Sequence, residues 1–136
     1  MTKNTDNEYR IKVSNRQTID SETDTIEETA YGNYTEKNGK QYITYKTEND
    51  GDKISSMIKI DGNEILIKRT GSVNSSMTYK VDTKKEFLYH LPYGTVPMEI
   101  ETQRIVSKLD ENGGTIELVY TLMVQGEKYF NDMKIT

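Results

Sequence analysis

The most restrictive feature of this sequence is a two-residue alternation of apolar and polar side chains, which recurs along most of its 136 residues. It is clear in the runs Met77/Tyr79/Val81 and Leu118/Tyr120/Leu122. A period of two is typical of β-strands that bury one face and expose the other to solvent. No segment of helical length shows a 3.6-residue period, and the sequence therefore predicts an all-β fold.

Turn-forming residues separate the alternating segments about every ten residues, which is typical of a sandwich or a barrel. Asn38-Gly39 predicts a type I′ hairpin turn, because both central residues of that turn need a positive φ. Gly32 is a candidate β-bulge within a strand. We predict strands over 9–19, 26–34, 41–47, 54–60, 65–69, 77–81, 86–92, 97–108, 115–124 and 128–135.

The strands are joined by short hairpins, so the simplest topology is an up-and-down meander. Closing that meander into an antiparallel barrel removes its exposed edges. The length suits one domain, which can bury roughly two thirds of its unfolded surface. We predict a flexible N-terminal segment over 1–8 and a single β-barrel domain of about eight to ten strands over 9–136.

The segment from Phe87 to Val106 changes phase partway along. Its apolar face is odd-numbered in the first part and even-numbered in the second: Phe87, Tyr89, Leu91 and Tyr93, then Met98, Ile100 and Val106. Because a strand has a strict period of two, the slip requires a turn, a bend or an extra residue between them. We place it between Gly94 and Pro97, as proline cannot donate a hydrogen bond to a sheet ladder.

The run Tyr93-Gly94-Thr95-Val96-Pro97-Met98-Glu99-Ile100, followed by Thr102 and Ile105, resembles a motif of the YwiB-like family of uncharacterised bacterial proteins. Gly114, the alternation over 118–122 and Gly126 resemble the C-terminal half of that family. The resemblance implies a calycin-like, lipocalin-like closed barrel. It implies no activity and no catalytic residue, because the family is a domain of unknown function.

Several chemistries are excluded or disfavoured by composition. The chain has no cysteine, which rules out disulfides and thiolate metal sites. With a net charge of −4 and scattered lysines, it lacks the basic stripe that nucleic acid requires. No signal sequence and no apolar segment of membrane-spanning length is present, and we expect a cytoplasmic protein without a membrane partner.

Catalytic machinery is not evident either. His90 is the single histidine, and it is out of phase with Phe87 and Tyr89, which predicts an outer-face or strand-end position. Carboxylate pairs such as Glu99 and Glu101 are expected on a solvated strand face. The sequence therefore predicts no catalytic residues, no metal site and no cofactor.

Two arginines and three tyrosines are the candidate ligand-binding residues. Arg104 is in phase with Ile100 and Thr102, and Arg69 is in phase with Ile65 and Ile67. An inward guanidinium must be paired or reach solvent. It could pair internally with Glu28, lie at the barrel mouth, or bind an anionic group of a ligand. The full set of candidates, with the inward-phased tyrosines, is Arg104, Arg69, Tyr79, Tyr89 and Tyr120.

These observations favour a non-catalytic β-barrel that binds a small amphiphilic or anionic molecule in its lumen or at its mouth. The alternative is a solid-cored protein-interaction or assembly module, for example a homodimer. An apolar patch on the outer face would favour that alternative, because monomers rarely expose one.

Overall fold

The computed structural model describes residues 1–5 and 8–136, and in that part of the chain every regular element is a β-strand. The all-β prediction is therefore confirmed. Eleven strands are present: β1 (Thr2–Thr5), β2 (Glu8–Ile19), β3 (Glu22–Lys37), β4 (Lys40–Asn49), β5 (Asp52–Asp61), β6 (Glu64–Gly71), β7 (Ser75–Lys80), β8 (Lys84–Leu91), β9 (Gly94–Asp110), β10 (Gly113–Val124) and β11 (Glu127–Ile135).

The hairpins form where the turn residues predict them. Asn38 and Gly39 have φ values of 54° and 77°, the positive pair that a type I′ turn requires. Consecutive strands from β2 to β7 and from β8 to β11 pair antiparallel, which confirms the meander within each series. β11 then pairs with β2 and joins the two series.

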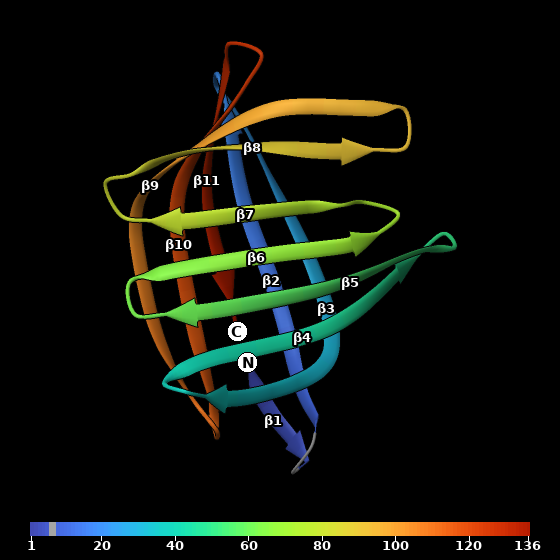
Figure 1. Cartoon of the computed structure of the whole chain (residues 1–136), viewed down its shortest axis with the longest axis vertical. Helices are drawn as coiled ribbons and strands as arrows, with labels where there is room; N and C mark the ends of the chain where they lie inside the picture. Colours follow the sequence, from blue (N-terminus) through green and yellow to red (C-terminus); the bar gives the residue numbers. More distant parts are fainter. Residues whose placement is uncertain (6–7) are drawn as a thin grey trace.

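All eleven strands belong to one sheet that curls around a buried interior. Strands β4 to β8 run across β2, β10 and β11, so the sheet forms two facing layers (Figure 1). Ile58, Ile65, Ile100 and Leu118, from both layers, are fully buried between them. At the ends of the strand order, β7 and β8 are joined in the described residues by a single backbone bridge, between Asn74 and His90. We call this junction the seam.

The phase slip after Tyr93 is real, but its cause differs from the prediction. The turn that separates β8 from β9 is formed by Pro92 and Tyr93, and Gly94 is already paired with Leu91. Pro97 lies inside β9, opposite Leu88. A hairpin turn, rather than a bend at Gly94 and Pro97, therefore changes the phase.

Within the segment predicted to be flexible, 1–8, residues 1–5 are paired with the sheet, while residues 6–7 fall outside the described part of the chain. Thr2–Thr5 form β1, which pairs with β2 and β10, and the Met1 side chain is buried in the core. A Cβ at Gly113 would lie 2.4 Å from the Met1 carbonyl oxygen. The missing side chain at Gly113 thus lets this polar segment approach the sheet.

Gly32 is not a bulge, because its pairing with Tyr9 on β2 and Tyr45 on β4 is regular. A Cβ at this position would lie 2.0 Å from the Thr44 carbonyl oxygen. β3 pairs with β4 over residues 32–37, whereas residues 22–31 pair with β2 on one side alone in the described structure. Glycine is thus required where β3 crosses from one layer to the other.

One end of the interior is closed by hydrogen-bonded side chains, and we call it the closed end. The Tyr9 hydroxyl donates to the Glu111 carbonyl oxygen at 2.6 Å. Gln41 Nε2 donates to the Tyr34 hydroxyl at 2.9 Å and to the Leu109 carbonyl oxygen at 2.7 Å. The rings of Tyr9 and Tyr34 meet edge to face with centroids 5.9 Å apart. These side chains cover the core and satisfy backbone acceptors together.

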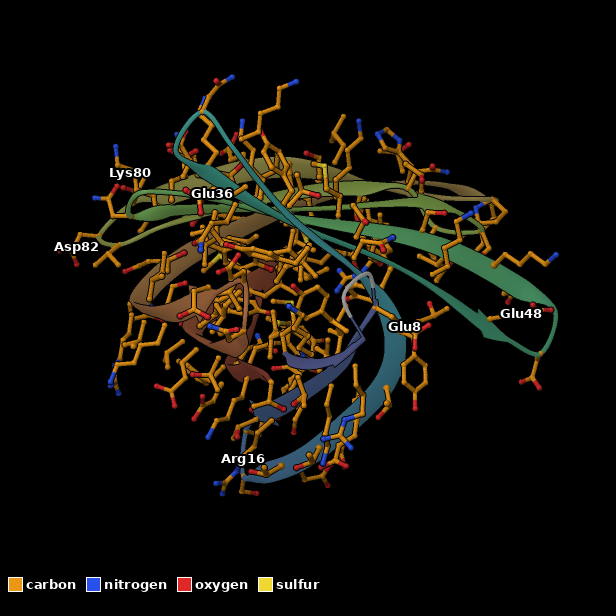
Figure 2. The ribbon with its side chains drawn as sticks, turned by 90° about the horizontal axis from the view of Figure 1, so that it is seen from below. Glu8, Arg16, Glu36, Glu48, Lys80 and Asp82 are labelled. Carbon is orange, nitrogen blue, oxygen red and sulfur yellow. The ribbon has the colours of Figure 1, made fainter. Side chains whose placement is uncertain are left out.

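The opposite end, where β3 separates from β4, is the open end. Ile26 and Glu28 share the inner face of β3 with the buried Ala30, yet both are exposed, Ile26 to 63%. The β4–β5 hairpin extends beyond the rest of the sheet here, with Glu48 near its tip (Figure 2). The inner face at this end is therefore reached by solvent.

Candidate functional site

A row of polar side chains crosses the inner face of β4 to β7 near the open end. Tyr45, Ser56, Arg69 and Ser75 are direct cross-strand partners, one on each strand. Partners in this position project from the same face of a sheet. The next inward row is apolar and contains the buried Ile43, Ile58, Ile67 and Met77. The polar row thus marks the boundary between the core and the open end.

Arg69 is the charged member of this row. It is the direct cross-strand partner of Ser56 and Ser75, and Ser56 is in turn the partner of Tyr45. Burial raises the pKa of Tyr45, while the charge of Arg69 opposes the rise. No ion pair within 4.0 Å involves Arg69 in the described residues. Its charge therefore has no counter-charge within that distance among the described residues.

Two predicted tyrosines are buried in the core and contact each other. The rings of Tyr79 and Tyr120 pack edge to face, with centroids 4.8 Å apart. Burial raises the pKa of both, that of Tyr79 to well above its usual range, and the positive charge of Arg69 opposes both shifts. The structure thus brings Tyr79 and Tyr120 together, with Arg69 two inward rows along the sheet from Tyr79. We call these three with Tyr45, Ser56 and Ser75 the Arg69 cluster.

Tyr45, Ser56 and Ser75 were missed as site residues. A signal existed for two of them: Tyr45 is in phase with Ile43, and Ser56 interrupts the apolar phase set by Ile54 and Ile58. A polar residue within an apolar phase indicates an inward hydroxyl that needs a partner. The row that they form depends on pairing register across four strands, which single-strand patterns do not contain.

The prediction that Arg104 points inward is wrong. β9 and β10 shift register between Val119 and Tyr120, whose partners are Arg104 and Thr102, which leaves Gln103 as an extra residue. This β-bulge reverses the alternation, so that Thr102 is buried and Arg104 faces outward. Its side chain is 64% exposed, with Nη2 3.8 Å from Glu117 Oε2. The sequence basis for placing Arg104 in the lumen is thereby removed.

The internal ion pair with Glu28 is not formed in the described structure. Glu28 lies on the inner face, as predicted, but it is exposed at the open end. Burial is the main cause of the raised pKa of Tyr45, and the negative charge of Glu28 adds to it. Glu28 forms no ion pair with Arg69 or Arg104 in the described structure.

Tyr89 and His90 both lie near the end of β8. Tyr89 is half-buried opposite Val96, and no described contact joins it to Tyr79 or Tyr120. His90 is exposed, which confirms the predicted outer or strand-end position, and its Nδ1 is 3.3 Å from Thr95 Oγ1. Its backbone forms the seam bridge to Asn74.

Buried hydroxyls near the open end have unused hydrogen-bonding capacity. In the described structure, Ser75 Oγ and Thr102 Oγ1 are buried and have no hydrogen-bond partner. Buried polar atoms are normally paired, so each such atom requires an explanation. On β11, by contrast, Asn131 is fully used: Oδ1 accepts from Asn15 and Gln17 at 3.1 Å and 3.0 Å, and Nδ2 donates to the Tyr129 carbonyl oxygen.

In the described residues no group of three or more His, Asp or Glu side chains is arranged to hold a metal ion. Over the same residues, no helix has the length and apolarity needed to cross a membrane. What the geometry offers chemically is a positive charge, neutral phenols and free hydroxyls beside an apolar core.

This arrangement is that of a β-barrel protein with a row of polar side chains at the open end of its interior. The fold superimposes on the crystal structure of the YwiB protein from Bacillus subtilis with a TM-score of 0.88 and 26% sequence identity, covering 95% of this chain and 89% of that one. The uncharacterized β-barrel protein YwiB of Bacillus subtilis (strain 168) is 29% identical over 118 residues, which are 86% of this chain and 83% of the relative.

Residues 11–136 match the family described as "Domain of unknown function (DUF1934)", and the chain belongs to this family. The resemblance inferred from residues 93–126 is thereby confirmed. The family description names no activity, so function has to be argued from the site.

Proposed function

We propose that the protein binds a small anionic or amphiphilic molecule at the open end of its interior. The observation that supports the proposal is Arg69, an inward, half-buried guanidinium that forms no ion pair within 4.0 Å among the described residues. A charge that is partly desolvated and lacks a counter-charge is less favourable than one that is paired. A carboxylate or phosphate group at the Arg69 cluster would offset that cost and form charge-assisted hydrogen bonds.

The surroundings of Arg69 support an amphiphile over a simple ion. Phe87 and Leu122 are partly buried apolar residues that pack against the core. Phe87 is the cross-strand partner of Met98, and Leu122 is that of Ile100, so both project into the interior. An apolar chain would bury the exposed remainder of these side chains, worth roughly 25 cal/mol per Å² of apolar area.

Isothermal titration with decanoate, decyl phosphate and decanol tests this function. We expect both anions to bind, and Arg69→Gln to weaken them at least about tenfold, equivalent to about 1.4 kcal/mol. Decanol binding should change little, because it carries no charge. Arg104→Gln is the matched control, since that arginine is exposed on the outer face. Equal losses in the two variants, or no binding of any probe to the unmodified protein, would refute the proposal.

The assembly alternative has weaker support. The exposed large apolar side chains Ile26, Tyr31, Leu88, Tyr93 and Phe130 are distributed over β3, β8, β11 and the β8–β9 turn. Ile26 is on the inner face of β3. Phe130 is on the outer face of β11, where its cross-strand partners are Thr121 and Thr18. Native mass spectrometry after mild purification separates the alternatives: a retained small mass favours the binder, and a dimer mass without an adduct favours assembly.

A further inference from the structure

The seam between β7 and β8 is a bounded slot in the wall of the sheet. At one side, Asn74 and His90 exchange two backbone hydrogen bonds, of 3.3 Å and 3.0 Å. At the other side, Asp82 N donates to the Thr102 carbonyl oxygen at 3.0 Å, and Thr102 N donates to that of Thr83 at 3.4 Å. No ladder pairs β7 with β8 between these points in the described residues. The facing backbone groups therefore remain available to solvent or a ligand.

A cavity of about 420 Å³ lies at this slot. Its lining includes three pairs of adjacent residues, one each from β6, β7 and β8: Lys68/Arg69, Ser75/Ser76 and Phe87/Leu88. Adjacent side chains of a strand project from opposite faces. The cavity is thus bordered by outer-face and inner-face residues together, as expected for an opening through the sheet.

The lining has a distinct charge. None of its nine described residues is acidic, although the chain has 22 Asp and Glu against 18 Lys and Arg. Lys68 lies on the outer side of the slot and Arg69 on the inner side. Ser75 is on β7, between β6 and β8, and its buried Oγ has no partner in the described structure. Two positive charges and a free hydroxyl form a site for an oxyanion.

We propose that the seam is the port of this binding site, in which the oxyanion head group of an amphiphile lies between Lys68 outside and Arg69 inside. The apolar chain then follows Phe87 into the interior, toward Leu122. This inference rests on the proposed function, in which Arg69 binds an anionic amphiphile. It adds the route of entry, the position of the head group and the contribution of Lys68 and the Ser75 hydroxyl.

A reversible cross-link across the slot tests the port. The Asn74–His90 bridge places Ser76 opposite Leu88, two residues further along each strand. The chain contains no cysteine, so S76C with L88C creates one defined disulfide. T18C with T23C, a direct pair within the β2–β3 ladder that does not line the cavity, is the matched control. Rates are measured in stopped flow with decyl phosphate.

We expect oxidation of the seam pair to slow association at least about tenfold, which corresponds to about 1.4 kcal/mol, and reduction to restore the rate. The control disulfide should leave the rate unchanged. Equal association rates in the oxidised and reduced seam pair would overturn the port, whereas binding that still depends on Arg69 would preserve the proposed function. Absence of binding in the unmodified protein would refute both.

A second variant tests the head-group position without a cross-link. Lys68→Gln should weaken decyl phosphate and decanoate several-fold to about tenfold and leave decanol unchanged. Lys59→Gln, on the outer face of the adjacent β5, is the control. Equal affinities in the two variants would overturn the role of Lys68. Inorganic phosphate that binds as tightly as decyl phosphate would overturn the amphiphile assignment, because the apolar chain would then contribute nothing.

Discussion

The two ends of the interior use polar side chains in opposite ways. At the closed end, Gln41 and Tyr9 donate to backbone carbonyl oxygens of Leu109 and Glu111, so the polar atoms that cover the core are paired. At the open end, Arg69 forms no described ion pair, and Ser75 Oγ has no described partner. The difference indicates that one end is built for stability, while the other retains unused hydrogen-bonding capacity and charge.

The largest expected difference between the core and the open end is in the free energy of unfolding lost when an inner-face isoleucine is replaced by alanine. Ile58→Ala should lower the free energy of unfolding by about 2–5 kcal/mol, because the fully buried side chain leaves a cavity. Ile26→Ala should cost less than about 1 kcal/mol, since that side chain is already 63% exposed. Urea unfolding of both variants measures the contrast, and similar losses would show that the open end is packed in solution.

The closed end should be sensitive to loss of its hydrogen bonds. Gln41→Ala removes the donor to the Leu109 carbonyl oxygen and to Tyr34, which predicts a loss of about 1–3 kcal/mol. The comparison is Gln103→Ala, which removes an exposed hydrogen bond to Thr121 and should change stability by no more than about 0.5 kcal/mol. Equal urea unfolding midpoints for Gln41→Ala and Gln103→Ala would contradict a stabilising role for the hydrogen bonds of the closed end.

Alkaline pH should destabilise the Arg69 cluster. Burial raises the folded-state pKa of Tyr79, Tyr120 and Tyr45 above the unfolded value of roughly 10. Above that pH the unfolded chain binds fewer protons than the folded one, so stability is complete below roughly pH 10 and falls as pH rises. Urea midpoints across this range measure the fall. Tyr79→Phe should reduce it, and Tyr93→Phe, at an 85% exposed position, should not.

Removing the unpaired charge should produce a small gain in stability at the open end. Arg69→Met is expected to raise the free energy of unfolding of the ligand-free protein by about 1 kcal/mol, because an inward charge is replaced by an apolar side chain. Arg104→Met loses an exposed ion pair with Glu117 and should cost at most about 1 kcal/mol. A clear destabilisation by Arg69→Met would mean that Arg69 serves the fold rather than a ligand.

Local patterns were sufficient for most of the fold. The hairpin at Asn38-Gly39 and the strand around Ile58 depend on residues next to one another in the chain, and both agree with the structure. β1 was missed because it forms through pairing of Met1 with Gly114, 113 positions away. No periodicity within residues 1–8 reports that contact.

The site was predicted in part for a related reason. Arg69, Tyr79 and Tyr120 could be placed inward because their strands keep one phase throughout. Arg104 was misplaced because the extra residue Gln103 is defined by the register of β9 against β10, not by the sequence of β9 alone. Alternation therefore predicts which face a side chain takes within each regular part of a strand. The prediction fails when the same phase is continued past a bulge.

The pairing of β2 with β11 has a consequence for synthesis on the ribosome. Val13 is opposite Ile135, and the ladder continues to Thr18 opposite Phe130. The C-terminal part of β2 thus lacks one neighbour until β11 has emerged, and such distant pairing slows folding. During that interval the nascent sheet exposes two strand edges, and completion of β11 is the event that commits the chain to its final architecture.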